Sequence, residues 1–505
     1  MDSQTAMDST GEGPVTACDR RRTLAAAFPW VISAVLIVAG LGYSARPAIS
    51  MAEFCDLQPK QLAPRPATGP THVTTVTVWA DARVRTCWLT YMAVAAAPLV
   101  TNHAIQVEAT PLVMEDTTAW QLMREAAAHG RAPDIVHIDV NALNDFMRAG
   151  YLIPLDSCIA SHPEFTNIRP DVWRPAIFSG HVWGVPTEAD VTALYFNKVA
   201  LRKLGWSEAR IEALPQHIQD GEWTFDDLRA TAGEAIAKHI IAPGFGIWPI
   251  RAKDAQLYTL YLMGGGRAYD PVAGKPVINQ RRLAEAIGLR RAMFRERLTA
   301  PFFEGVIGPV WNRNVARRDA FIGGRVLFFL DDATEWGNLL AKLPGASATR
   351  FLDELMGVAL IPIAKQGQAA RAGSFVSFNW FYALTSDTAS SGRHHQAEAC
   401  ALLAKMTLPV LNDLHTSVNG SASVMTARSP SVPAARHGYD MGAMIDHAWP
   451  MPVQPPITGQ TWAAYSGAFL ETADHSEADT DSDSVLAGRM VDKLRQSLGD
   501  EVIVE

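Results

Sequence analysis

Runs of residues typical of strands alternate with runs typical of helices over residues 73–138, and this alternation restricts the fold more than any other feature. The strand-like runs are short and rich in β-branched residues, whereas the runs between them are longer and more helical in pattern. Strands are predicted at 73–79, 104–108 and 134–138, and helices at 88–100 and 120–129. This succession predicts a parallel sheet covered on both faces, so we expect an α/β fold.

Polar residues follow two of the predicted strands. Ligands of open α/β sheets bind beyond the carboxyl ends of the strands. Asp81 follows the first predicted strand, and Asp139 and Asn141 follow the third. We therefore expect these three side chains at the mouth of a binding site.

The stretch 182–198 contains two short apolar runs that flank two carboxylates, Glu188 and Asp190. Pro186 lacks a backbone donor, so it belongs at a strand edge or a crossing point. We predict two strands joined by a segment that brings both carboxylates to one place. An exposed turn with two solvated acids is the alternative that the residues leave open. Further on, Thr224 and Asp227 predict a capping box at the start of a helix.

The composition is that of a folded protein and argues against a nucleic-acid partner. Of the 505 residues, 48% are hydrophobic and 19% are charged, which is ordinary for a globular chain. This length suffices for about three domains. The net charge is −8 and no basic patch offsets it, so nucleic-acid phosphates would be repelled.

The first 52 residues resemble an export signal. Three arginines at 20–22 precede an apolar run at 25–43, and Ser50-x-Ala52 follows. This order predicts a secretory signal cleaved before Glu53, with an uncleaved membrane anchor as the alternative. Residues 53–72 are rich in proline and are expected to form a linker. The folded part is thus expected outside the cytoplasm, in the periplasm or at the cell surface. If the N-terminal segment is not cleaved, it would tether the protein to the membrane.

Four cysteines follow the signal, at 55, 87, 158 and 400. In an oxidising compartment they permit three complete pairings, and the spacing does not choose among them. No Cys-x-x-Cys occurs, so neither a redox motif nor a zinc ribbon is indicated. We expect no metal and no cofactor.

Several landmarks occur in the order known from one family. They are Val76–Trp79, Pro133–Val136, Gly150–Asp156, Gly184–Lys198, Trp223–Leu228 and Phe321–Trp336. With these landmarks the chain resembles the family 1 extracellular solute-binding proteins of ABC-type sugar importers, the maltose-binding-protein-like group. The most specific landmark is Gly184–Lys198, which is similar to the family's "GxP…lYYNK" signature. The resemblance covers about residues 73–500.

The resemblance implies two α/β lobes with a ligand cleft between them, the periplasmic-binding-protein type II fold. The chain would cross the hinge three times, near Pro186, Leu360–Pro362 and Val424. The first lobe would comprise 73–187 with 361–422, and the second 188–360 with 423–505. We expect no disulfide to be needed for this fold, because the family builds two large cores without one.

Sugar recognition needs hydrogen-bonding groups for the hydroxyls and aromatic rings for the apolar face of the sugar. By the resemblance, Asp190 matches the carboxylate of the family's cleft. The expected ligand-binding residues are Asp190, Glu188, Asp81, Asp139, Asn141, Trp79, Trp248, Trp336 and Trp462. Trp248 is included because it is expected in a loop, whereas Trp88, Trp120 and Trp206 lie in helical patterns and are expected in the core.

These features predict a binding protein that captures a mono- or oligosaccharide, or a sugar-like polyol, and delivers it to an ABC transporter permease. We expect it to act as a monomer and not as an enzyme. Thr334 and Ile138 stand where maltose-type members have aromatic residues, which argues against maltodextrin. The alternatives are a secreted glycoside-processing enzyme that uses Glu188 and Asp190, and a ligand sensor for a membrane receptor.

Two acidic segments suggest other chemistry only weakly. Asp331 and Asp332 could be an acid/base pair, but adjacent strand residues point to opposite faces, so we expect a solvated turn. The run 471–483 ends like the start of a calcium loop, yet Ser484 and Met490 occupy positions that need Gly and Glu. We expect a flexible charged loop there.

Overall fold

The computed structural model describes residues 73–81, 87–112, 116–248, 253–270, 272–299, 317–333, 335, 339, 354–364, 375–419, 421, 423–426, 449–450 and 459–505. Strands and helices alternate at the start of this part, which confirms the α/β prediction. The first elements are β1 (Thr74–Asp81), α3 (Cys87–Ala96), β2 (Ile105–Leu112), α4 (Asp116–Ala128), β3 (Ile135–Asp139) and α5 (Val140–Arg148).

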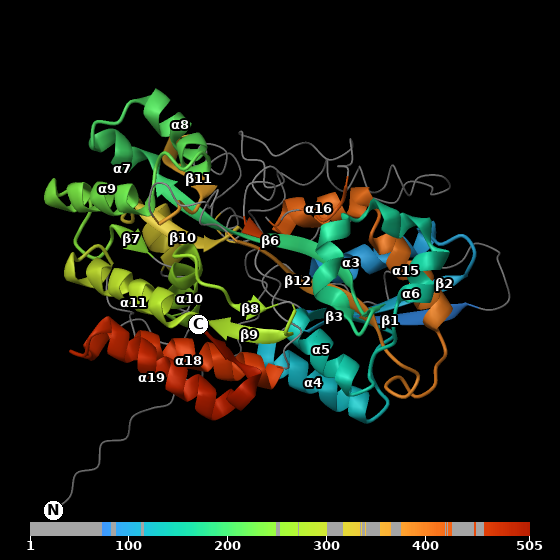
Figure 1. Ribbon diagram of the computed structural model, residues 1–505. Helices are drawn as coiled ribbons and strands as arrows, with labels where there is room; N and C mark the ends of the chain where they lie inside the picture. The colour runs from blue at the N-terminus through green and yellow to red at the C-terminus, as the bar shows by residue number, and fades with distance from the viewer. Residues whose placement is uncertain are drawn as a thin grey trace, which may run out of the picture.

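The first lobe is built on a sheet with the strand order β2-β1-β3-β12-β6. β1 is parallel to β2 and β3, whereas β12 (Phe375–Leu384) is antiparallel to both β3 and β6 (Val185–Asn197). Helices α3, α15 (Gln396–Met406) and α16 (Pro409–Asn419) lie on one side of this sheet, and α4 and α5 on the other (Figure 1). The carboxyl ends of β1 and β3 therefore share one edge of the sheet.

The second lobe is built on the other half of β6. Here β6 pairs with β10 (Phe328–Asp332) and β11 (Met356–Leu360), and β10 pairs with β7 (Ile247–Trp248). The helices of this lobe are α7 (Lys198–Lys203), α8 (Glu208–Gln219), α9 (Phe225–Ala237), α10 (Lys253–Met263), α11 (Gln280–Arg295), α18 (Gly459–Ala478) and α19 (Asp483–Leu498). α9 begins at the predicted capping box: Thr224 accepts from the backbone of Asp227, and the Asp227 carboxylate accepts from Thr224 N at 2.8 Å.

Strand β6 belongs to both lobes (Figure 1). Val191 pairs with Val376 of β12, whereas the next residue, Thr192, pairs with Asp332 of β10. The prediction of two strands joined by a turn is therefore wrong, because 185–197 is one continuous strand. Pro186 lies near the start of this strand, where one missing donor interrupts the ladder least. The strand partners of β6 change between Val191 and Thr192, four residues after the predicted lobe boundary at 187.

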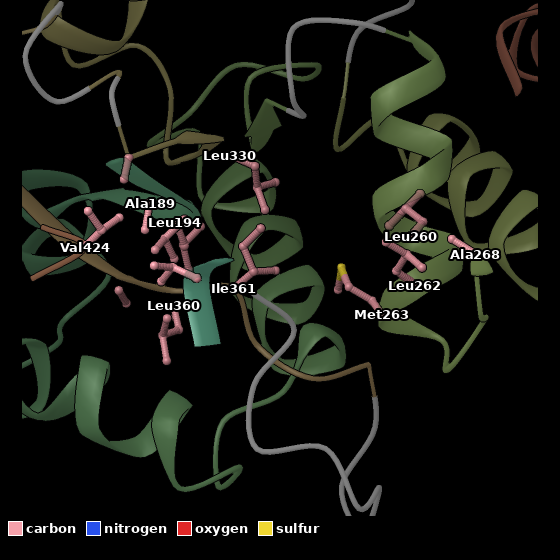
Figure 2. Close-up of a cluster of buried hydrophobic side chains, with 14 of the residues drawn as sticks. Ala189, Leu194, Leu260, Leu262, Met263, Ala268, Leu330, Leu360, Ile361 and Val424 are labelled. Carbon is pink, nitrogen blue, oxygen red and sulfur yellow. The ribbon is translucent and has the colours of Figure 1, made fainter. Parts of the chain in front are cut away.

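The chain passes between the lobes twice more, from β11 to β12 and from α16 to α18. Side chains from all three passages pack in one core (Figure 2). Figure 2 shows this group around β6 and a second group on and just after α10. The first group is Ala189, Leu194, Leu330, Leu360, Ile361 and Val424, and the second is Leu260, Leu262, Met263 and Ala268.

Short elements complete the described part. They include α6 (Asp156–Ser161), the β4 (Ile177–Phe178) and β5 (His181–Val182) hairpin, β8 (Tyr269–Asp270), β9 (Lys275–Ile278), β13 (Trp449–Pro450), β14 (Ile503–Val504) and several 3-10 turns. No helix among the described residues is both long and apolar enough to cross a bilayer. The predicted signal and linker lie outside the described residues.

A disulfide joins Cys158 of α6 to Cys400 of α15. It selects a pairing that the cysteine spacing left open, and it links two segments of the first lobe.

The acidic segment between α18 and α19 is held by two arginines. Arg291 donates to the carbonyl oxygens of Ser476, Asp479 and Asp481 at 3.1, 2.7 and 2.6 Å. Arg489 donates to the Asp479 carboxylate at 2.8 Å. The prediction of a flexible charged loop is wrong, because residues 471–478 belong to α18 and the residues that follow are held by these hydrogen bonds.

Candidate ligand cleft

Three residues lie side by side across the sheet of the first lobe: Asp139 and Glu188, which were predicted as site residues, and Trp380, which was not. Trp380 in β12 pairs with Asp139 of β3 on one side and with Glu188 of β6 on the other. The pairing of β12 with β6 is irregular on both sides of Trp380. Such bulges re-aim side chains and are common next to binding sites. The row lies at the carboxyl end of β3, where the α/β pattern predicts a ligand.

Two elements bring further predicted residues to this edge. Trp79 and Asp81 lie at the end of β1, and Trp79 is half-buried against a core cluster of this lobe. The Asp81 side chain lies outside the described set. Asp139 caps α5 by accepting from Ala142 N at 2.8 Å. Asn141, in the first turn of α5, has a buried side-chain oxygen with no hydrogen-bond partner among the described residues.

An aromatic row extends from Trp380. His137 stacks on Trp380, with ring centroids 5.1 Å apart and planes 10° apart. The ring of Trp120 in α4 also lies close to Trp380, with ring centroids 6.0 Å apart. Both tryptophans are half-buried, so the expectation of a core position for Trp120 holds only in part. Trp380 was not predicted, because its strand-like run gives no sign of which strands it will join.

Glu188 is buried, with 6% of its surface exposed. One oxygen of its carboxylate accepts from His415 Nε2 at 2.9 Å and from Ser421 Oγ at 2.7 Å. Burial raises the pKa of this carboxyl, but the hydrogen bond and charge of His415, with smaller contributions from Ser421 and His137, outweigh burial and lower the pKa to about 2. Glu188 is therefore an ionised, internally bonded group.

Asp190 has a different environment. It is half-buried, and its Oδ1 accepts from the backbone of Val191 at 2.9 Å. It pairs with Ser377 and lies just before the point where β6 changes lobes. Of the two carboxylates on β6, Asp190 is the one at the junction of the lobes with access to solvent.

The second lobe contributes less than predicted. Trp248 lies in β7 rather than in a loop, is 4% exposed, and donates to Gly244 O at 3.1 Å. Its ring stacks on Phe245, so Trp248 belongs to the core of the second lobe. This position argues against the predicted contact between Trp248 and a ligand. Trp336 lies outside the described residues. Trp462 lies in α18, and its side chain is outside the described set.

The two adjacent aspartates at the end of β10 also differ from prediction. Asp331 is 2% exposed and its carboxylate lies 3.3 Å from the guanidinium of the partly buried Arg317, so it is a buried, paired carboxylate at a strand end and not part of a solvated turn. Next to it, Arg318 donates to Glu335 at 2.8 Å, and both are buried. Within the described ranges, no group of three His, Cys, Asp or Glu residues could hold a metal ion.

The fold defines a two-lobe α/β protein. The model of the bacterial extracellular solute-binding protein family matches residues 101–407, and the chain belongs to this family. It is 29% identical over 142 residues to an uncharacterized lipoprotein of Streptomyces antibioticus. That match spans 28% of this chain and 28% of the relative.

Solved structures share the fold at low identity. The GacH receptor of Streptomyces glaucescens is 18% identical, with a TM-score of 0.64 over 84% of this chain and 98% of that chain. A maltose-bound MalE3 of T. maritima is also 18% identical, with a TM-score of 0.63 over 84% of this chain and 100% of that chain. Both likenesses show the two-lobe fold.

Proposed function

We propose that this protein captures a carbohydrate between its lobes and delivers it to the permease of an ABC-type importer. The observation that carries the proposal is the position of Asp190, half-buried where β6 passes between lobes and near the row that contains Trp380. A carboxylate accepts from neighbouring sugar hydroxyls, and an indole ring packs against the apolar face of a pyranose. Asn141 would supply a further hydrogen-bonding group.

Relatives support a sugar over other solutes. The GacH receptor is known in complex with acarbose, and the MalE3 structure contains maltose. Family membership and the lipoprotein relative support an exported protein, with retention at the membrane by the N-terminal segment as the finer proposal. Action as a monomer is likewise proposed.

The geometry disfavours the alternative of a glycoside-processing enzyme. Such enzymes use a carboxylic acid that is protonated near neutral pH and a second carboxylate. The pKa of Glu188 is lowered to about 2 and its carboxylate is occupied by His415 and Ser421, so it cannot act as that acid. Asp190 alone does not make the required pair.

The test is a thermal-shift screen of the purified protein with maltose, acarbose, monosaccharides and polyols, followed by calorimetric titration of each stabilising compound. We expect at least one carbohydrate to raise the melting temperature and to be recovered unchanged. A chromogenic glycoside should also remain intact. Stabilisation by amino acids or peptides only, or release of the chromophore, would overturn the proposal.

A further inference from the structure

Helix α16 contacts two of the three passages between the lobes through buried polar side chains. Asn412 Nδ2 donates to Thr187 O of β6 at 2.6 Å. The same amide accepts, through Oδ1, from Ser423 Oγ at 2.9 Å and from Val424 N at 3.3 Å. Asn412 therefore bridges the β6 passage and the segment that follows α16. Its exposed fraction is 2%, so water cannot replace these bonds.

His415 makes a second bridge of the same kind. It lies three residues after Asn412, and therefore on the same side of α16. Its Nε2 lies 2.9 Å from Glu188 Oε2, and the same oxygen accepts from Ser421 Oγ at 2.7 Å. His415, Glu188 and Ser421 are all buried. Asn412 and His415 thus bond two adjacent residues of β6, Asn412 also bonds Ser423 and Val424 of the returning segment, and Ser421 of that segment bonds Glu188 directly.

The surroundings of Glu188 explain why the second bridge is strong. A buried carboxylate is costly unless it is paired and hydrogen-bonded. His415 and Ser421 bond it from α16 and the segment after it, His137 favours its charge from β3, and Tyr382 of β12 also faces it closely enough to be affected by that charge. Removing His415 would leave Glu188 with one hydroxyl donor from this side.

We propose that Asn412 and His415 form a pivot clamp, which fixes β6, Ser423 and Val424 to α16 on the side of the first lobe. Bending of β6 on opening and closing then begins beyond Val191, where its strand partners change. Glu188 is a positioning residue in this arrangement: it is bonded toward α16 and holds the strand that presents Asp190. The proposal deepens the proposed function, on which the role of Asp190 as a ligand contact rests.

The test is hydrogen exchange of the full chain without any ligand, so it does not depend on the proposed sugar. Asn412→Leu and His415→Gln should accelerate exchange of the amides at 187–191 at least tenfold while leaving β1 and β3 protected. Thr416→Val is the matched control, because among the described residues this buried hydroxyl bonds within α16, to Asp413 O. Its exchange pattern should equal that of the unsubstituted protein.

Milder variants keep the test valid if Asn412→Leu does not fold. Ser421→Ala removes a donor to Glu188 and Ser423→Ala removes a donor to Asn412, and each should accelerate exchange of 187–191 by a smaller factor. Unchanged exchange in all the clamp variants overturns the proposal. Equal acceleration throughout the first lobe also overturns it, because that result indicates general destabilisation. A failed sugar screen would leave these outcomes intact and would count against the proposed function alone.

Discussion

Glu188 and Asp190 are two residues apart on β6, but Glu188 accepts two hydrogen bonds from the segment 415–421 whereas Asp190 is bonded to its own neighbour, Val191. The first carboxylate is buried and the second is half-buried at the junction of the lobes. A pair that looks equivalent in sequence thus divides into an internal anchor and a group that can meet a ligand.

The first prediction concerns acid stability. The pKa of Glu188 is lowered from 4.5 to about 2, so its stabilising effect is complete above pH 4.5 and is lost as the pH falls toward 2. The melting temperature of the unsubstituted protein should therefore fall more steeply than that of Glu188→Gln between pH 5 and 2. Near neutral pH, Glu188→Gln should cost on the order of 2–3 kcal/mol of unfolding free energy. Glu212→Gln, which changes an exposed carboxylate of α8, should follow the unsubstituted protein; parallel curves for Glu188→Gln would disprove the ionised anchor.

The second prediction concerns the aromatic row. Trp380→Leu should weaken binding of the sugar found by the screen roughly tenfold, about 1.4 kcal/mol, because a ring face is lost from the cleft. Trp206→Leu is the matched control: this ring is buried beside Arg210, 3.7 Å from the guanidinium, in the second lobe. It should lower the melting temperature and leave the affinity unchanged. If Trp380→Leu binds the sugar as tightly as Trp206→Leu does, Trp380 is not part of the binding site.

The third prediction concerns the disulfide. The bond between Cys158 and Cys400 spans a sequence separation of 242 residues, so it restricts the unfolded chain strongly. Cys158→Ala with Cys400→Ala should reduce stability by about 2–5 kcal/mol while the far-ultraviolet circular dichroism stays native. A reductant should destabilise the unsubstituted protein and have no further effect on the double variant. Loss of the native spectrum would show that the expectation of a fold independent of disulfides is wrong.

The fourth prediction concerns the junction of α18 and α19. Arg291→Met should destabilise the protein by about 1–3 kcal/mol, because three carbonyl oxygens and the Asp483 carboxylate lose their donor. Arg281→Met, on the same helix but mostly exposed, should change stability by less than about 0.5 kcal/mol. Thermal melting of both variants decides the matter, and similar losses would mean that the Arg291 contacts contribute little.

Local patterns in the sequence were sufficient for the fold class and for some of the elements around the candidate site. The alternation at 73–138 and the capping box of Thr224 and Asp227 depend on neighbours in the chain, and both are confirmed. Trp380 could not be found this way, because its place opposite Asp139 and Glu188 results from pairing with two distant strands. The same reason applies to Trp248, whose partner strand β10 lies far along the chain.

The acidic residues were the hardest to interpret, since an Asp or Glu in a sequence does not show its partner. Asp331 is neutralised by Arg317, and Glu188 is bonded to His415, 227 residues later. Periodicity reports which side chains are buried in a strand or helix, but it carries no information on such long-range pairs. The ligand-binding roles of Asp190, Trp79 and the remaining cleft residues therefore stay predictions.

The last prediction is that Asp190 contacts the ligand and is needed for closure. It lies where the strand partners of β6 change from the first lobe to the second, so a ligand bonded to it can touch both lobes. A ligand shifts an open–closed equilibrium only through contacts that differ between the two states. Asp190→Ala removes a charged acceptor and should weaken binding by about 1.5–3 kcal/mol, roughly tenfold to a hundredfold.

The fold should survive this change, because Asp190 lies outside the clamp and is only half-buried. Calorimetric titration with the sugar from the screen, beside a melting curve, measures both effects. Asp190→Asn is the matched control: it keeps an acceptor oxygen without the charge and should retain part of the affinity. An unchanged affinity in Asp190→Ala would move the site elsewhere in the cleft. A collapsed melting temperature would instead assign Asp190 a role in holding β6, which the solvent access of its side chain argues against.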